Sequence, residues 1–321
     1  KVHPHYLFAG AEGSLGITAE MTLRITPIPK AKQMVVIQSD TIHEAAQMVN
    51  MGLSAQVNAI EMMDHVVLKM AKDEPEGQRV QSRWGISLAD TVLLLCEWVG
   101  DDVSWVNDQC HAFSTQLQSE KVSHFLVDDT AEMQDLWALR SKGVGLLTRQ
   151  SDHRVPIAFI EDTVVSPIVL PEYIQALTQL LSTYEFEFGM YGHADVGCIH
   201  VRPALDLRDE QDRNALKPLS DAVFNLVRYF GGIMTGEHGR GFRSEYTPEI
   251  FGPELSSVLR QIKRAADPHN QLNPGTIIAP HAQDDLKSVD GPLRSDQDRQ
   301  ISAEWQDQFS DLLKCNGNAR C

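Results

Sequence analysis

The sequence lacks the features that mark nucleic-acid-binding and membrane-spanning proteins. Its 321 residues include 28 Lys and Arg against 44 Asp and Glu, a net charge of −16, and the basic residues form no cluster. Binding to a phosphate backbone depends on such clusters, so we expect no nucleic-acid partner. No apolar run approaches the roughly 18–20 residues that cross a bilayer, so we expect no transmembrane segment.

A secretory leader and a disulfide framework are also missing. Residues 1–10 lack the basic-then-apolar order of a signal peptide, and they include no initiator Met. Because the chain begins as if in the middle of a strand, we expect it to be a piece of a longer polypeptide. The five cysteines are odd in number and lack the spacing of a small disulfide scaffold, which indicates a reducing compartment. We therefore expect a cytoplasmic location, with peripheral attachment to the inner membrane as the alternative.

What is present is an ordinary globular composition, with 42% apolar residues, and a length sufficient for about two domains. Three cysteines lie in apolar or amphipathic stretches, where we expect buried thiols: Cys96, Cys110 and Cys198. Apolar periodicity predicts strands at 21–25, 34–40, 91–99, 124–127 and 157–165, and two short strands within 185–203. It predicts helices at 41–52, 101–120, 130–150, from Pro171 onward and at 216–230.

Strands and helices that alternate without the glycine-rich phosphate turns of a doubly wound sheet indicate an α+β fold. We expect an antiparallel sheet with helices on one face, of the split βαβ or ferredoxin-like type. Beyond about residue 280 the composition becomes polar and acidic, which is typical of a linker.

The first segment that could carry chemistry is Gly10-Ala11-Glu12-Gly13-Ser14-Leu15-Gly16-Ile17-Thr18. Three glycines with a hydroxyl between them allow the backbone to approach a planar or phosphate-bearing ligand closely. The spacing is not that of the dinucleotide-binding G-x-G-x-x-G motif. A plain structural turn remains the alternative.

The second segment carries two histidines, in Gly192-His193-Ala194-Asp195-Val196-Gly197-Cys198-Ile199-His200. On one straight strand, histidines seven residues apart would face opposite sides. A turn at 195–197 would instead allow His193 and His200 to converge on one point. Ordinary hydrogen-bonded histidines are the alternative.

The third segment is the loop 231–241, which contains five glycines together with Glu237 and His238. Two histidine nitrogens and one carboxylate are the usual protein ligands of an open catalytic metal site, and Zn, Mn and Fe all accept them. A flexible loop with a solvated Glu-His pair is the alternative. Arg140 and Arg202 are candidate carboxylate clamps, because a guanidinium matches a carboxylate with two hydrogen bonds. Surface salt bridges would explain the same two arginines.

Taken together, these segments resemble the FAD-linked oxidases of the vanillyl-alcohol-oxidase type. The stretch AGAEGSLGITAEMTLRI (9–25) is similar to the end of that family's flavin domain. The Gly192-His193 pair with His200, the sequence GEHG (236–239) and the sequence DPHNQLNPG (267–275) match the family's later motifs in order and spacing.

The resemblance implies a division of the chain into three parts. Residues 1–30 would end an FAD-binding domain, 31–280 would form the substrate and metal domain, and 281–321 would be a linker and the start of an iron–sulfur module. The implied reaction is oxidation of a D-2-hydroxy acid, with D-2-hydroxyglutarate favoured and D-lactate next. We expect this piece of the protein to bind FAD weakly and to be inactive alone.

The resemblance also assigns roles to individual residues. A divalent metal would be held by His193, His200 and Glu237, with His238 as the catalytic base and Arg140 and Arg202 on the substrate carboxylates. The expected flavin contacts are Gly10, Glu12, Gly13, Ser14, Gly16, Ile17, Thr18 and Asn273.

This chain departs from the family pattern in two places. The usual turn GHxGDGNLH is GHADVGCIH here, so Cys198 replaces an Asn. A family lysine is replaced by Ile160, which leaves Arg154 or Arg202 as substitutes. Both changes affect the contacts expected for a second substrate carboxylate.

The end of the chain resembles one branch of the family, in which an iron–sulfur module follows the flavin domains. HVRPALD (200–206) and the terminal CNGNARC carry this resemblance, which makes Cys315 and Cys321 candidate ligands of a [4Fe-4S] cluster in the full-length protein. A tail with two incidental cysteines is the alternative. The resemblance leaves the electron acceptor unidentified and is compatible with a homo-oligomer.

Two other classes of function fit parts of the sequence. A metal-dependent hydrolase could use His193, His200 and Glu237 to activate water, although no nucleophile elbow or HExxH helix accompanies them. A non-catalytic assembly domain could use the glycine-rich loops to dock a partner. Neither alternative explains the flavin-like segment at 9–25.

Overall fold

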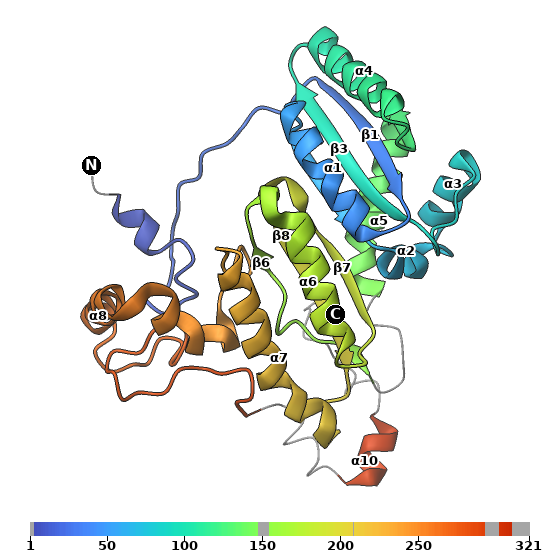
Figure 1. Ribbon diagram of the computed structural model, residues 1–321. Coiled ribbons are helices and arrows are strands. Elements are labelled where there is room, and N and C mark those ends of the chain that lie inside the picture. Colours follow the sequence, from blue (N-terminus) through green and yellow to red (C-terminus); the bar gives the residue numbers. More distant parts are fainter. Residues whose placement is uncertain (1–2, 147–153, 208, 293–301, 310–321) are drawn as a thin grey trace.

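The computed structural model describes residues 3–146, 154–207, 209–292 and 302–309 (Figure 1). Its strands are β1 (Ala31–Ser39), β2 (Ala59–Met63), β3 (Val92–Gly100), β4 (His124–Val127), β5 (Val155–Pro156), β6 (Thr163–Val164), β7 (Phe188–His193) and β8 (Cys198–Leu205). Its α-helices are α1 (Ile42–Ser54), α2 (His65–Ala71), α3 (Pro75–Trp84), α4 (Val103–Ser119), α5 (Thr130–Leu146), α6 (Leu170–Ser182), α7 (Glu210–Tyr229), α8 (Thr247–Ala266) and α10 (Ala303–Gln308).

The strands form one sheet in the order β4-β1-β3-β2-β7-β8-β5, with β6 also paired to β8. Every pairing is antiparallel. The first four strands in that order follow a β-α-β-β-α-β pattern, in which α1 connects β1 to β2, α4 connects β3 to β4, and the additional helices α2 and α3 lie between β2 and β3. The predicted antiparallel α+β fold of split βαβ type is therefore confirmed.

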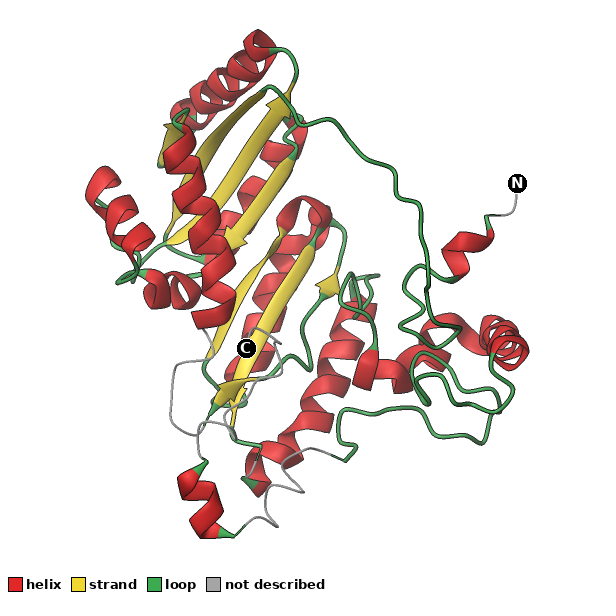
Figure 2. Ribbon diagram, turned by 180° about the vertical axis from the view of Figure 1, so that it is seen from behind, coloured by secondary structure: helices red, strands yellow, loops and turns green. Residues whose placement is uncertain are grey.

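Helices cover both faces of the β1–β4 part of the sheet, as the two ribbon views show (Figures 1 and 2). On β1, Val35 and Ile37 belong to the core shared with α1, α4, α6 and α7, whereas Met34 and Val36 belong to the core shared with α2, α3 and α5. The sequence pattern predicted helices on one face of the sheet only, and this part of the prediction is wrong. The second layer is needed because β1 and β3 carry apolar side chains on both sides, so water must be excluded from both.

The sheet changes character where β7 and β8 continue it beyond β2. Met190, Ile199 and Val201 still face the core that α6 and α7 cover. The opposite side of these strands carries polar residues instead, among them His200 and Arg202 of β8. This polar face is the part of the fold on which the candidate site is built.

Several predicted elements differ from the structure. Residues 19–29 have no regular secondary structure, so the predicted strand at 21–25 is wrong. Its alternating apolar residues are exposed, because no other described strand pairs with them: Met21, Leu23 and Ile25. The predicted strand at 157–165 is interrupted, because the backbone turns through Asp162 at φ 67° between β5 and β6.

Five of the described elements were not predicted, namely β2, α2, α3, α8 and α10. No described helix is both long and apolar enough to cross a membrane.

The N-terminal segment runs from β1 across the molecule to the end of α8 (Figure 1). There the fully buried Lys263 donates from Nζ to the backbone oxygens of Ser14 and Leu272, at 2.8 Å each, and to Asp267 Oδ2 at 2.7 Å. The ammonium holds the pKa of Asp267 down at about 2. Asn273 Nδ2 adds a hydrogen bond of 2.7 Å to the backbone oxygen of Glu12. The motif at 267–275 thus fastens the glycine segment 10–16 to the rest of the chain.

Candidate active site

The hairpin of β7 and β8 brings the two predicted histidines together. Its register pairs Tyr191 with His200 and His193 with Cys198, so the two histidines lie diagonally across the ladder. Gly197 closes the turn at φ 71°, where a Cβ atom would lie 1.9 Å from the Val165 carbonyl oxygen. The ring centroids of His193 and His200 are 5.5 Å apart.

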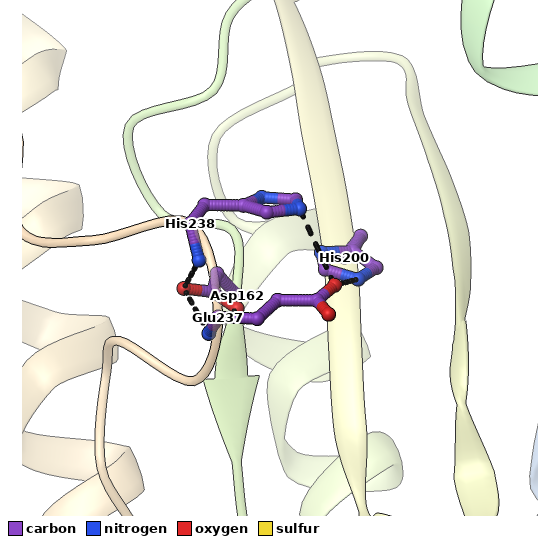
Figure 3. Close-up of side chains that lie close together, drawn as sticks. All are labelled: Asp162, His200, Glu237 and His238. Atoms are coloured by element: carbon purple, nitrogen blue, oxygen red, sulfur yellow. Dashed lines mark hydrogen bonds and ion pairs between the residues drawn. The ribbon is translucent and has the colours of Figure 1, made fainter. Parts of the chain in front are cut away.

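Three imidazoles converge on one carboxylate oxygen. Glu237 Oε1 lies 3.0 Å from His200 Nε2, 3.2 Å from His193 Nε2 and 3.3 Å from His238 Nε2. His200 and His238 stack with centroids 4.7 Å apart, and Figure 3 shows both rings beside the Glu237 carboxylate. Residues from two strands and a loop about 40 positions further along the chain therefore meet at one point.

The fully buried Asp162 fixes the backbone that presents Glu237 and His238. Its Oδ1 accepts a hydrogen bond of 2.9 Å from Glu237 N, and its Oδ2 accepts one of 3.0 Å from His238 N (Figure 3). Arg243 donates to the carbonyl oxygens of Met234 and Gly239, at 2.9 Å each, and to that of Glu161. Asp162 lies close enough to join a metal-binding group with His200, Glu237 and His238. Because its oxygens already accept backbone N–H groups, we assign it to loop support.

Two of the histidines, His193 and His238, each contact a buried glutamate through Nδ1, the ring nitrogen that faces away from Glu237. Glu61 Oε1 lies 2.6 Å from His193 Nδ1, and Glu61 Oε2 accepts a hydrogen bond of 2.7 Å from Arg140 Nε. A carboxylate accepts but does not donate, so the Nδ1 proton of His193 faces Glu61 and Nε2 faces the centre. We name this set, Arg140–Glu61–His193, the first arm.

A second set of residues repeats the pattern. Glu161 Oε1 lies 3.1 Å from His238 Nδ1, and Glu161 Oε2 accepts a hydrogen bond of 2.8 Å from Arg202 Nε. We name Arg202–Glu161–His238 the second arm. In both arms a guanidinium, a carboxylate and an imidazole lead to Glu237, and the terminal nitrogens of both arginines make no hydrogen bond within the described part of the chain.

The electrostatics differ between neighbouring histidines. Burial, with the nearby His238, His193 and both arginines, lowers the pKa of His200 to about 3, so its imidazole is neutral at physiological pH. The hydrogen bond to Glu61 instead raises the pKa of His193. Burial raises the pKa of Tyr191, which stacks under the Arg140 guanidinium at 4.7 Å, to about 12.

Part of this donor set has the spacing of a divalent metal site. The described group whose ligand atoms all lie within 4.8 Å of one another contains His200, Glu237 and His238 with Asp162, and His193 adjoins it through its contact of 3.2 Å with Glu237 Oε1. Bonds of about 2.1 Å in tetrahedral geometry place ligand atoms about 3.4 Å apart, close to the 3.0–3.3 Å between Glu237 Oε1 and the imidazole nitrogens. A neutral imidazole is the form that binds metal, and a second carboxylate behind a ligating histidine is the usual support. His200 and His193 meet these two requirements respectively.

The remaining predicted residues are placed as follows. Glu12 and Ser14 contact the C-terminal part of the chain, whereas the other expected flavin residues are exposed: Gly10, Gly13, Gly16, Ile17 and Thr18. Cys198 is buried, with Sγ 3.6 Å from Asp162 Oδ1. Ile160 packs in the core, and Arg154 pairs with Asp212 on α7. Cys315 and Cys321 lie outside the described residues.

Sequence reasoning missed four residues that support the site: Glu61, Glu161, Asp162 and Arg243. A signal was present for the acidic ones. Each is a carboxylate within or beside an apolar run, AIEMM for Glu61 and AFIED for the other two, and a buried carboxylate requires a partner.

Comparison with known proteins identifies the family. The family model for FAD linked oxidases, C-terminal domain, matches residues 28–277. The chain belongs to this family. As an FAD-linked oxidase domain, it is 39% identical over 324 residues to a D-2-hydroxyglutarate dehydrogenase from Pseudomonas putida and 36% identical over 326 residues to one from Escherichia coli. Each alignment covers 98% of this chain and 32% of the relative, so the chain spans about a third of the length of these curated relatives.

Solved structures show the same fold at lower identity. The domain is similar to p-cresol methylhydroxylase, with a TM-score of 0.59 and 13% identity, covering 79% of this chain and 54% of the other. Its similarity to alkyldihydroxyacetonephosphate synthase has a TM-score of 0.59 and 14% identity, with coverage of 85% and 49%.

Proposed function

We propose that this chain is the substrate and metal part of an FAD-dependent dehydrogenase that oxidises a D-2-hydroxy acid to the 2-oxo acid. D-2-hydroxyglutarate is the favoured substrate and D-lactate the next. The observation that carries the proposal is the convergence of three imidazoles on Glu237 Oε1 between two buried Arg–Glu pairs. The names of the relatives, among them a D-lactate dehydrogenase (cytochrome) from Arabidopsis thaliana at 25% identity, support the substrate class.

In this proposal His193, His200 and Glu237 hold a divalent metal, which is Zn, Mn or Fe. When bound, such an ion acts as a Lewis acid that lowers the pKa of a coordinated hydroxyl. The chain contributes the orientation. Glu61 fixes the His193 ring through Nδ1, so that its Nε2 lone pair faces the centre, and burial keeps the His200 imidazole neutral.

His238 is the proposed base. Its Nε2 points to the centre, and Glu161 at Nδ1 keeps the ring in the tautomer whose Nε2 accepts a proton. Glu161 also stabilises the imidazolium that forms when Nε2 takes the substrate hydroxyl proton. The flavin, when bound, accepts the hydride from C2.

Arg140 and Arg202 are the proposed carboxylate clamps. Each uses Nε to bind its glutamate, which fixes the plane of the guanidinium. The terminal nitrogens then form a rigid pair of donors, which matches a carboxylate better than a flexible ammonium would. One arginine in each arm provides one clamp for each carboxylate of a 2-hydroxy diacid.

The wider organisation is also part of the proposal. Residues 1–30 complete a flavin domain, 31–280 form the substrate domain, and 281–321 lead to an iron–sulfur module with Cys315 and Cys321 among its [4Fe-4S] ligands. Cys96, Cys110 and Cys198 are free thiols, which supports a reducing, cytoplasmic compartment. A homo-oligomer belongs to the same proposal.

The test is anaerobic flavin bleaching of the intact polypeptide, with and without a chelator, against the D- and L-forms of lactate and 2-hydroxyglutarate. We expect one D-acid, 2-hydroxyglutarate first, to bleach the flavin and a chelator to abolish the bleaching. Bleaching that a chelator leaves unchanged would contradict the metal assignment. Absence of bleaching with all four acids would contradict the substrate class and leave a flavin-dependent fold of unassigned chemistry.

A further inference from the structure

The loop that carries Glu237 and His238 is held by carboxylates on both sides. On one side, Asp162 accepts the N–H groups of Glu237 and His238. On the other side, Glu12 Oε1 accepts a hydrogen bond of 2.6 Å from Arg240 N, and Glu12 Oε2 accepts one of 3.0 Å from Gly241 N. The second pair spans more than 200 residues of sequence, since Glu12 lies in the flavin-like segment.

The loop is shaped to admit the Glu12 side chain. A Cβ atom at Gly239 would lie 2.8 Å from Glu12 Cδ and 2.9 Å from its Oε1, closer than such atoms approach in proteins. Gly239 has φ 81° and Gly241 has φ 49°, conformations that favour glycine. Gly239 is therefore explained by the carboxylate that lies against it, and Gly241 by its backbone conformation.

Glu12 is itself held in place. The backbone oxygen of Glu12 accepts from Asn273 Nδ2, and that of Ser14 accepts from the buried Lys263 Nζ. With its backbone fixed at two points and both carboxylate oxygens engaged, Glu12 forms a rigid connection. Its carboxylate faces the loop 236–241, and the flavin contact that the sequence indicated for Glu12 stays a prediction.

We infer that Glu12 is a positioning residue, whose carboxylate fixes the loop 236–241 relative to the flavin-like segment and so sets the place of His238. The inference rests on the proposed function, in which His238 is the base. Reacting groups must be held within a fraction of an ångström, and a displacement of about 1 Å can cost about 100-fold in rate. The hydrogen bonds from Arg240 N and Gly241 N to Glu12 join the flavin-like segment to the backbone two and three residues after His238, and so fix that distance.

The experiment uses the intact polypeptide with Glu12→Ala and Glu12→Gln. Glutamine keeps the shape but offers only one acceptor oxygen, so one of the two N–H groups loses its partner. Hydrogen–deuterium exchange of peptides covering 238–243 should rise in both variants. The rate of flavin reduction should fall about 10- to 100-fold. The metal content and the Kd of the D-acid should remain near wild type, because Asp162 still accepts the Glu237 N–H group and the other two proposed ligands lie on β7 and β8.

The matched control is Glu254→Ala, because Glu254 is exposed on α8 and makes no hydrogen bond or ion pair in the described ranges. It should change neither exchange nor rate. Gly239→Ala adds a methyl group that would push the Glu12 carboxylate away from the loop 236–241, so it should reproduce the effect of Glu12→Ala. Glu12→Asp, which keeps the charge, should recover part of the rate.

Three results would overturn the inference. They are unchanged exchange at 238–243, raised exchange with an unchanged flavin reduction rate, or loss of metal in Glu12→Gln, which would indicate general support of the fold. Failure of the proposed function looks different, since the wild-type protein would then show no bleaching by any D-acid. The hydrogen–deuterium exchange measurement does not depend on turnover, so it would still test whether Glu12 holds the loop 236–241.

Discussion

The two arms of the site use the same three residue types in different structural settings. The first arm, Arg140–Glu61–His193, is built on α5, β2 and β7, that is, on regular elements. The second arm takes Arg202 from β8, but its Glu161 and His238 lie on the irregular segments 157–162 and 231–241. The glutamate–histidine separation is 2.6 Å in the first arm and 3.1 Å in the second.

This difference matches the roles that we propose. A metal ligand must hold a fixed position. A sheet strand provides this when the nitrogen of the ring that faces away from the metal makes a short hydrogen bond, as His193 Nδ1 does with Glu61. A base must accept and release a proton with a ring that reaches the substrate, and the His238 side chain is more exposed, 40% against 31% for His193. One carboxylate–imidazole pair can thus serve orientation on a rigid element and proton transfer on a loop.

His238→Ala should reveal the largest functional difference between the two arms. Removing a general base costs about 10²–10⁴ in rate, so flavin reduction by the D-acid should slow by that factor while the metal content stays at wild type. Stopped-flow flavin reduction and metal analysis on the same samples measure both. His111→Ala, an exposed histidine on α4, is the control. Near-native reduction in His238→Ala would remove the base from the second arm.

Substitution of the supporting glutamates, Glu61 and Glu161, should reveal a smaller functional difference between the two arms. Loss of the carboxylate behind a metal-bound histidine typically weakens metal binding about 10- to 100-fold, so Glu61→Gln should raise the metal Kd by that amount. Glu161→Gln should leave the metal Kd unchanged and slow flavin reduction by about tenfold. Metal titration of the chelator-treated protein and single-turnover reduction give the two readouts. Equal effects of both variants on metal binding would contradict the division of roles.

Part of this comparison could be predicted from the sequence. The apolar runs of β1 and β3 and the amphipathic pattern of α7 indicate the antiparallel α+β fold, because burial of one or both faces leaves a periodic signal. The short β2 and its neighbours α2 and α3 leave no such signal, since five to ten residues include too few periods. The strand at 21–25 was predicted from alternation, but a strand also requires a neighbour.

The residues that meet at Glu237 Oε1 could be predicted from the sequence, and their supporting residues could not. His193, His200, Glu237 and His238 stand in short glycine-rich motifs, where polar residues have few structural uses. Glu61 and Glu161 join the site only through the pairing of β2 with β7 and the path of 157–162 beside β8. Glu12 accepts a hydrogen bond from Arg240, which lies 228 positions later in the chain. Such partners depend on tertiary contacts, which local patterns do not encode.

The arginines should distinguish the arms by substrate. Arg140→Lys and Arg202→Lys remove the planar pair of donors, and loss of a charge-assisted hydrogen bond costs about 1.5–3 kcal/mol, or about 10- to 150-fold in KM. D-2-hydroxyglutarate has two carboxylates, so both variants should raise its KM. D-lactate has one, so only one of the variants should raise its KM. Steady-state kinetics with both acids measure this. If both variants weaken both acids equally, the two arginines grip the same carboxylate.

The smallest contrast concerns the pH dependence of stability in the metal-free protein. The pKa of the buried His200 is lowered to about 3, so its contribution is unfavourable in acid. The unfolded chain binds the proton first, and stability falls as the pH drops below about 6.5, by about 1 kcal/mol per pH unit. The pKa of His193 is raised by Glu61, so its stabilising effect is present in acid and is lost as the pH rises through that raised value. Thermal melting after chelation should therefore show His200→Gln gaining on wild type as the pH falls from 6.5 to 5.5, and His193→Gln losing on wild type as the pH falls toward 6.5 from above the raised pKa. The same sign for both variants would mean that the two imidazoles share one environment, contrary to the burial of one and the ion pair of the other.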